Sequence, residues 1–352
     1  MGNRRISCFR PVKGGLPTVA NRDVVAVGAS AGGVEALREL MVGLPDDLPA
    51  TVLIVLHLPA GGVSALAAIL DRAGPLPVDS AWHGAPLRHG HVYVAPADFH
   101  LLVADGELAL SRGPTENGHR PAVDALFRSA ATALGPRCVG VVLSGALDDG
   151  AAGLSSIAAR GGVAMVQDPA EALYPGMPEA ALREVPGSRV LPLQEMGQAL
   201  AELVRREVDS EQAAAPGTLT ALEAELAKHG EWQPEYETDA VGVPSGFSCP
   251  DCQGVLLVLR GTRRYRCRVG HAWTEEALLQ QKNDDLEQAL WTALRTLDEK
   301  TSLANRMHAS AVERHNGTMA RRYAEMARES EHAAGTLRAF LRTDFAAGER
   351  HA

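Results

Sequence analysis

Aromatic residues are scarce in this chain of 352 residues, at 4%, although hydrophobic residues make up 46% of it. A core of mainly aliphatic side chains is typical of alanine-rich α/β proteins. There is no excess of positive charge, because the formal net charge is −9, which argues against nucleic acid as the main partner. No apolar run approaches the roughly 18 residues of a membrane span, so the sequence predicts no membrane insertion.

Cysteines are also few, and their number, five, is odd. Three of them, Cys249, Cys252 and Cys267, share one short segment with His271. Residues 1–22 contain basic side chains but no apolar stretch of the kind found in secretory signals, and we expect a disordered lead-in there. Metal-like cysteine spacing without a signal favours a reducing, cytoplasmic setting.

Residues 23–208 alternate short apolar segments with helical patterns. The predicted strands are Val24–Val27, Val52–Leu56, His91–Val94, Val139–Leu143 and Val163–Val166, and the helices are Val34–Met41, Ala65–Ala73, Val123–Ala133 and Gly153–Ala159. This alternation predicts an α/β fold with a doubly wound, mostly parallel, Rossmann-like sheet. Leu101–Val103 and Leu108–Leu110 instead predict a hairpin.

The first predicted strand leads into a glycine-rich turn, Gly28–Gly33. Such a turn could bind phosphate, but Ser30 stands where a dinucleotide fingerprint needs its central glycine, and no Walker lysine follows. Two alternatives remain for Ser30. It caps the next helix, or it is a nucleophile held at the carboxyl end of a parallel strand, where functional residues gather.

Two other strand ends favour the nucleophile. His57 follows the second predicted strand, and Asp148 and Asp149 follow the strand at 139–143. The carboxyl ends of parallel strands lie at one edge of the sheet, so the three residue types are expected to meet there. A hydroxyl, an imidazole and a carboxylate supply the nucleophile, the general base and the orienting acid of acyl transfer.

These motifs resemble those of the CheB family of chemotaxis protein-glutamate methylesterases, over about residues 23–203. The resemblance is carried by Gly28–Gly33, His57–Pro59, His119–Phe127, Ser144–Gly153, Gln167–Pro169 and Gly176–Ala180. It implies that Ser30 is the nucleophile, His57 the general base and Asp149 the orienting acid, with no cofactor for catalysis. Asp148 stands where the family often has Asn.

The same resemblance implies further site residues. The backbone N–H of Ala146 would donate to the oxyanion, and Met177, His119 and Arg120 would line the cleft, with simple packing as the alternative for these three. The implied reaction is hydrolysis of glutamyl methyl esters on the cytoplasmic helices of chemoreceptors, and deamidation of glutamine through the same acyl-enzyme. A non-catalytic signalling scaffold and a serine esterase for small esters are the alternatives.

Members of this family commonly carry an N-terminal receiver domain of roughly 120 residues, but only about 22 residues precede the first predicted strand here. We therefore expect this chain to contain no receiver domain. Regulation of the activity would then be missing, would come from a separate regulator or signalling protein, or would lie in the C-terminal half.

The C-terminal half has three predicted parts. Residues 209–246 are rich in Pro, Gly and polar side chains and predict a linker, with a helix at Leu219–His229. Residues 247–274 predict a zinc-ribbon-like module, because C-x2-C followed by C-x3-H supplies four ligands for a tetrahedral structural Zn²⁺; a reduced C-x2-C turn is the alternative.

Residues 275–346 predict a hairpin of two amphipathic helices that pack on each other or on another chain. We expect this half to select the target or respond to a partner without taking part in bond breaking. Residues 23–208 would then fold and catalyse without it.

Overall fold

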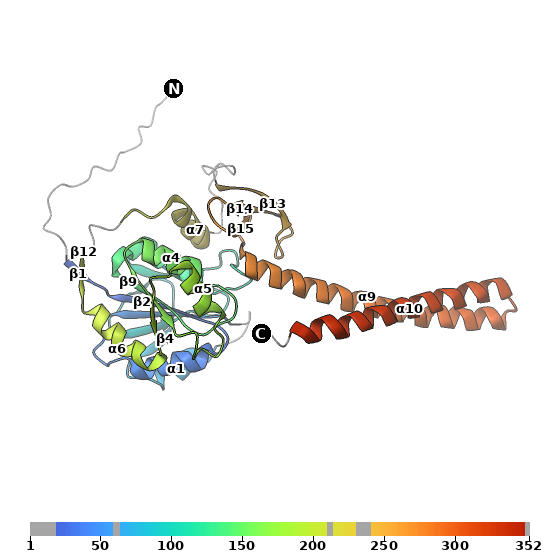
Figure 1. Ribbon diagram of the computed structural model, residues 1–352, viewed down its shortest axis with the longest axis horizontal. Coiled ribbons are helices and arrows are strands. Elements are labelled where there is room, and N and C mark those ends of the chain that lie inside the picture. The colour runs from blue at the N-terminus through green and yellow to red at the C-terminus, as the bar shows by residue number, and fades with distance from the viewer. Residues whose placement is uncertain (1–18, 59–63, 210–213, 230–240, 349–352) are drawn as a thin grey trace, which may run out of the picture. The chain divides into compact units, whose positions relative to one another are not determined.

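The computed structural model describes residues 19–58, 64–209, 214–229 and 241–348 (Figure 1). The chain divides into two compact units, and the boundary in the sequence lies between Thr274 and Glu275. The predicted segments 23–208 and 247–274 both lie in the first unit, while the five-segment division itself stays a prediction. The expected lead-in and linker fall partly on residues outside the described ranges.

A seven-stranded sheet forms the centre of the first unit, in the order β11-β10-β9-β2-β3-β6-β4, and all its neighbours pair in parallel. Its strands are β2 (Val24–Ala29), β3 (Thr51–Leu56), β4 (Val78–Ser80), β6 (His91–Val94), β9 (Cys138–Val142), β10 (Val163–Gln167) and β11 (Arg189–Leu191). The chain leaves β2 on one side toward β3 and later returns to its other side at β9. The predicted doubly wound fold is thus confirmed, with its switch point beside β2.

Helices cover both faces of this sheet (Figure 1). One hydrophobic core contains side chains of α1 (Gly33–Gly43), α2 (Leu66–Asp71) and α6 (Leu193–Val204). The core on the opposite face contains side chains of α3 (Val123–Leu134), α4 (Ala151–Ala159) and α5 (Gly176–Glu184). All six residues of β2 are buried, as are all six of β3, which explains why they read as continuous apolar runs.

Smaller elements complete the part of this unit that surrounds the sheet. β7 (His100–Ala104) and β8 (Glu107–Ser111) form the predicted hairpin, which β5 (Ala85–Pro86) extends. The pair β1 (Val19–Asn21) and β12 (Glu207–Asp209) was not predicted. A 3-10 turn, η1 (Gly135–Arg137), precedes β9, and α7 (Thr218–His229) packs against α3 and β8.

The Cys/His module, residues 242–274, is a four-stranded antiparallel sheet in the order β13-β14-β15-β16. Its strands are β13 (Gly242–Ser248), β14 (Val255–Leu259), β15 (Arg264–Cys267) and β16 (Ala272–Thr274). Strands β14 and β15 form a hairpin around Gly261. The module belongs to the same unit as the parallel sheet.

The second unit is a hairpin of two helices, α9 (Glu275–Glu313) and α10 (Gly317–Gly348), which pack along each other. Buried alanines recur every seven residues along both helices: Ala304 and Ala311 on α9, and Ala320, Ala327 and Ala334 on α10. Small side chains at this repeat let the two backbones approach closely. Within the described residues, no helix combines the length and the hydropathy that a membrane crossing requires.

Candidate active site

The turn after β2 places Ser30 at the carboxyl edge of the sheet. The Ser30 N–H donates to the Ser144 carbonyl oxygen at 3.0 Å, and the Gly33 N–H donates to the Ser30 carbonyl oxygen at 2.9 Å. Gly32 has φ 69°, and a Cβ there would lie 2.8 Å from Ser144 Oγ, so the turn requires glycine. Helix α1 has no side-chain cap, which removes the interpretation of Ser30 as a capping residue.

His57 connects this serine to Asp149. Nδ1 of His57 lies 3.1 Å from Ser30 Oγ, and Nε2 lies 2.7 Å from Asp149 Oδ2. An ionised carboxylate can only accept a hydrogen bond, so the neutral ring carries its proton on Nε2 and presents a lone pair at Nδ1. The Ser30 hydroxyl can therefore donate to His57, as deprotonation of a nucleophile requires.

Asp149 is 2% exposed and is held by the start of α3. The N–H groups of Val123 and Asp124 donate to its two oxygens at 2.7 and 3.1 Å. Burial alone would raise the pKa of Asp149, but the hydrogen bonds from His57 and from the Val123 N–H outweigh it and lower that pKa below its ordinary value. Asp149 is thus a carboxylate aimed at the imidazole.

His119 stacks on His57, with ring centroids 3.8 Å apart and an interplanar angle of 15°. Burial and the neighbouring His57 lower the pKa of His119 to about 4, so its ring is neutral near pH 7. Arg120 turns away toward Asp98, to which its Nη2 donates at 2.6 Å, and its Nη1 donates to the Gly113 carbonyl oxygen at 2.8 Å. The structure brings His119 to the triad, whereas Arg120 secures the loop beside it.

The loop after β9 carries the predicted oxyanion position. Ala146 is exposed, and Ser144 is buried beneath it. The Ser144 hydroxyl donates to the Ala31 carbonyl oxygen at 2.8 Å and accepts the Tyr174 N–H at 3.0 Å, which joins the loop to the serine turn. Met177 is fully buried, and its N–H donates to the Gly145 carbonyl oxygen at 2.8 Å, so Met177 supports this loop from the core.

Asp148, the other acid of the pair, contacts the Cys/His module. Its Oδ1 accepts a hydrogen bond from the Thr274 hydroxyl at 2.8 Å, and Thr274 belongs to the Cys/His module. Thr274 was not among the predicted site residues. Asp124 was not predicted as a site residue either, and its Oδ1 accepts the Gly153 N–H at 2.6 Å. The charged pair Asp124 and Arg128 on an otherwise apolar helix was a signal of a buried polar contact.

The four predicted metal ligands of the Cys/His module are clustered. The ligand atoms of Cys249, Cys252, Cys267 and His271 all lie within 4.8 Å of one another. Cys252 Sγ is 3.6 Å from Cys267 Sγ, and His271 Nδ1 is 3.5 and 3.7 Å from Cys267 Sγ and Cys249 Sγ. Tetrahedral zinc with Zn–S bonds of about 2.3 Å requires ligand atoms roughly 3.5–3.8 Å apart, so this set could hold a zinc ion with no open position.

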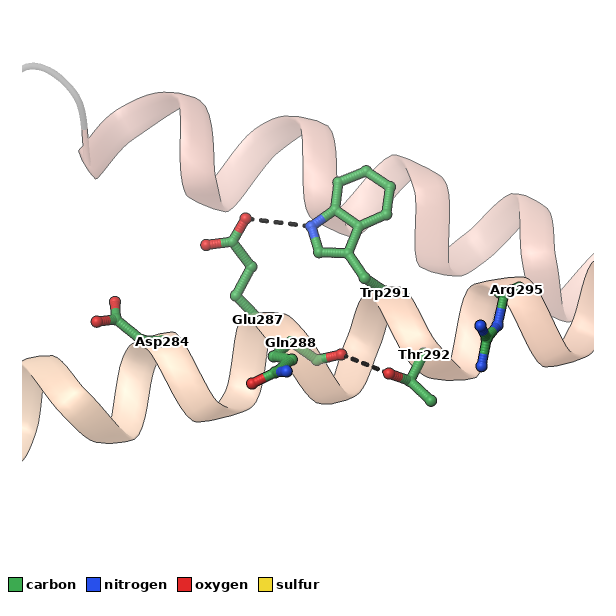
Figure 2. A pocket seen from close by; sticks show the side chains of 6 residues that line it. All are labelled: Asp284, Glu287, Gln288, Trp291, Thr292 and Arg295. Atoms are coloured by element: carbon green, nitrogen blue, oxygen red, sulfur yellow. Dashed lines mark hydrogen bonds between the residues drawn. The ribbon is translucent and has the colours of Figure 1, made fainter. Parts of the chain in front are cut away.

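A hollow of about 520 Å³ on α9 provides a contrast (Figure 2). Its lining residues all come from that helix: Asp284, Glu287, Gln288, Trp291, Thr292 and Arg295. The Trp291 Nε1–H donates to Glu287 at 3.1 Å, and the lining presents no base beside a nucleophile. The arrangement suited to acyl transfer is therefore the one at the sheet edge.

Comparison with known proteins agrees with this geometry. A family model described as CheB methylesterase matches residues 25–200. The chain is 41% identical over 203 residues to protein-glutamate methylesterase/protein-glutamine glutaminase 2 of Anaeromyxobacter dehalogenans, covering 57% of this chain and 60% of that protein. Protein-glutamate methylesterase/protein-glutamine glutaminase 2 of Methanosarcina mazei is 38% identical over 192 residues, covering 52% of this chain and 52% of that protein.

A solved structure is similar as well. The Thermotoga maritima CheB methylesterase catalytic domain is 33% identical, with a TM-score of 0.50, and the match covers 52% of this chain and 98% of that one. The chain thus spans a whole catalytic domain but only about half to three fifths of the length of the curated relatives above. The Cys/His module and the helical hairpin lie beyond the matched residues 25–200.

Proposed function

This chain belongs to the CheB methylesterase family, and we propose that it hydrolyses glutamyl methyl esters on chemoreceptors through a Ser30–His57–Asp149 triad. The observation that carries the proposal is the continuous hydrogen-bonded row from Ser30 Oγ through both ring nitrogens of His57 to Asp149. Within this proposal, the receptor's cytoplasmic helices are the substrate, so the protein acts in the cytoplasm.

The reaction has two halves. Ser30 Oγ attacks the ester carbonyl carbon while His57 Nδ1 takes the hydroxyl proton, and Asp149 stabilises the resulting imidazolium. His57 returns that proton to the departing methoxide, so methanol leaves and Ser30 carries the glutamyl acyl group. Water then attacks the acyl-enzyme with His57 as base, which releases glutamate and restores Ser30. With a glutamine side chain, ammonia leaves in place of methanol.

The surroundings suit this chemistry. The oxyanion formed in each half would be stabilised by backbone N–H groups, with Ala146 as one donor. His119 is neutral near pH 7, because its pKa is lowered to about 4, so it lies against His57 without placing a second positive charge beside the imidazolium. Every group in these steps belongs to the chain, and the reaction requires no cofactor.

We also propose that Cys249, Cys252, Cys267 and His271 bind one structural Zn²⁺. When bound, the ion would order the turns that carry its ligands, and its four protein ligands would leave no position for a reacting water. The helical hairpin is proposed to contact a regulator or another signalling protein, since α9 exposes Leu286, Trp291 and Leu303.

The test is mass spectrometry of a methylated chemoreceptor cytoplasmic fragment incubated with the full-length chain. We expect loss of methyl groups with wild type and none with Ser30→Ala. Ser156→Ala is the matched control, because that hydroxyl donates to the Ala152 carbonyl oxygen within α4. A chain that cleaves p-nitrophenyl acetate but leaves the receptor methylated would be a small-ester esterase, and one inactive on both would be a scaffold.

A further inference from the structure

The Cys/His module packs against the segments that hold the triad, although it lies beyond the residues shared with the family. We propose that this module is a positioning element of the active site, acting through Thr274 and Arg266 on the residues that orient His57. The inference rests on the proposed esterase function. It assigns to the module a part in catalysis that involves no contact with the reacting atoms.

The first contact joins β16 to the loop that precedes His119. The Asn117 N–H donates to the Ala272 carbonyl oxygen at 2.8 Å, and the Thr274 N–H donates to Asn117 Oδ1 at 2.9 Å. The Ala272 N–H donates to the Thr115 carbonyl oxygen at 3.2 Å. Three hydrogen bonds, two between backbone groups and one to the Asn117 side chain, therefore hold this loop at Thr115 and Asn117, shortly before the ring that stacks on the catalytic base.

The second contact reaches the acidic pair directly. The Thr274 hydroxyl donates to Asp148 Oδ1 at 2.8 Å, and Thr274 is 8% exposed. Asp148 precedes Asp149, whose Oδ2 lies 2.7 Å from His57 Nε2. Fixing the Asp148 side chain restricts the backbone on which Asp149 stands, and a displacement of a fraction of an ångström there would move the imidazole.

The third contact is a buried network of charges. Arg266 of β15 lies between two carboxylates, with its Nη2 at 3.1 Å from Glu116 Oε1 and 3.0 Å from Glu223 Oε1. Glu116 also pairs with Arg128 of α3, and all four side chains are at most 2% exposed. The first turn of α3 donates the two N–H groups that hold Asp149, so the network ends on the helix that orients the triad acid.

The metal ligands adjoin this network. Arg266 precedes Cys267, and its Nη1 donates to the Gly270 carbonyl oxygen at 2.6 Å, inside the turn between Cys267 and His271. The Cys267 N–H donates to the His271 carbonyl oxygen at 3.0 Å, which closes the turn that leads into β16. A metal bound by Cys267 and His271 would thus order the same turn that presents Arg266 and Thr274 to the catalytic domain.

The loss of one charge from this buried network is energetically costly. Removing one member of a buried ion-pair network leaves its partner charged and desolvated, which is far worse than removing the whole network. A chain without the module would lack Arg266, which would leave Glu116 paired with Arg128 alone, at the base of the loop that carries His119. This proposal differs from the expectation that residues 23–208 catalyse by themselves, because it makes their alignment depend on the module.

The first experiment uses Thr274→Val in the full-length chain, with Thr274→Ser as the rescue that keeps the hydroxyl. Thr262→Val is the matched control, because Thr262 lies in the same module and its hydroxyl makes local contacts, donating to the Leu259 carbonyl oxygen and accepting the Arg264 N–H. On a short methyl-glutamyl peptide we expect Thr274→Val to lower kcat about tenfold with KM unchanged, the order expected for one lost hydrogen bond to a carboxylate. Thr274→Ser and Thr262→Val should stay within twofold of wild type.

The second experiment removes the metal from the full-length chain with a chelator and follows three readouts. These are zinc content, the rate at which a fluorophosphonate labels Ser30, and hydrogen exchange of peptides covering residues 114–128. We expect metal removal to slow labelling at least tenfold and to speed exchange of the Val123 and Asp124 amides, and zinc to restore both.

The outcomes separate the two proposals. If wild type is not labelled, the proposed serine hydrolase function fails. If wild type is labelled, and Thr274→Val and the chelated chain are labelled at the same rate as wild type, the triad stands and the positioning role of the module is overturned. If chelation unfolds the whole first unit, the kcat of Thr274→Val alone decides, because that variant keeps all four metal ligands.

Discussion

Substituting the two neighbouring acids one at a time tests the assignment of the triad acid. In Asp149→Asn, one carboxylate oxygen becomes an NH₂ group at a site that receives three donors: His57 Nε2 at 2.7 Å and the N–H groups of Val123 and Asp124 at 2.7 and 3.1 Å. Whichever way the amide turns, its NH₂ faces a donor. If it faces His57, the ring must place its proton on Nδ1, which then cannot accept the Ser30 proton.

The size of the effect follows from this geometry. An Asp→Asn change in a Ser–His–Asp triad lowers kcat by about 10⁴, which is about 5.5 kcal/mol of transition-state stabilisation. The same order is expected here, because Asp149 is 2% exposed and water cannot replace the lost acceptor. Asp148→Asn keeps an oxygen that can accept the Thr274 hydroxyl, so its kcat should fall less than about threefold.

The assay is single-turnover release of methanol from a methyl-glutamyl peptide, with enzyme in excess, so that acylation is observed without product release. Circular dichroism and the unfolding midpoint would show that both variants are folded. Equal losses in the two variants, or a larger loss in Asp148→Asn, would refute the reasoning and transfer the orienting role to Asp148. A loss in Asp149→Asn below about tenfold would mean that His57 takes the correct tautomer without the carboxylate.

Three further predictions concern the base, the metal and acid stability. Ser30→Ala and His57→Ala should each lower kcat by several orders of magnitude, and the double variant should be no worse than the poorer single, because the two act as one unit. Purified protein should contain about one zinc per chain by elemental analysis, and Cys249→Ser should lose it. The pKa of His119 is lowered to about 4 in the folded protein, whereas in the unfolded chain the same ring binds a proton below about pH 6.5. The free energy of unfolding should therefore fall by on the order of 3 kcal/mol as pH decreases from about 6.5 to 4. His119→Gln should flatten that decline, as measured by urea titrations at several pH values.

The convergence of Ser30, His57 and Asp149 could be predicted because each residue follows a strand of the parallel sheet. Ser30 and His57 each follow a buried strand, and Asp149 follows β9, so a parallel sheet alone suffices to bring them to one edge. The clustering of Cys249, Cys252, Cys267 and His271 could be predicted equally well, since C-x2-C and C-x3-H spacing fixes which side chains can converge. In both cases short stretches of sequence determine the geometry.

The contact between Thr274 and Asp148 could not be predicted from the sequence. Its partner Asp148 lies 126 residues earlier, and no periodicity or spacing relates a hydroxyl at the end of β16 to a carboxylate after β9. The short pair β1 and β12 was missed for the same reason, since it joins residues 19–21 to 207–209. For Met177 the sequence left two alternatives, lining the cleft or packing, because a hydrophobic side chain gives no sign of which it does; the structure buries it fully.

Helix α3 links the Ser30–His57–Asp149 site to the Cys/His module. Its first turn binds Asp149, and one turn later Arg128 binds Glu116, the carboxylate that Arg266 of the Cys/His module also contacts. These charged side chains are buried, so the full set of ion pairs forms only when helix, loop and module are present together. We therefore expect a substitution in this module, which lies outside the matched residues 25–200, to alter the position of His57.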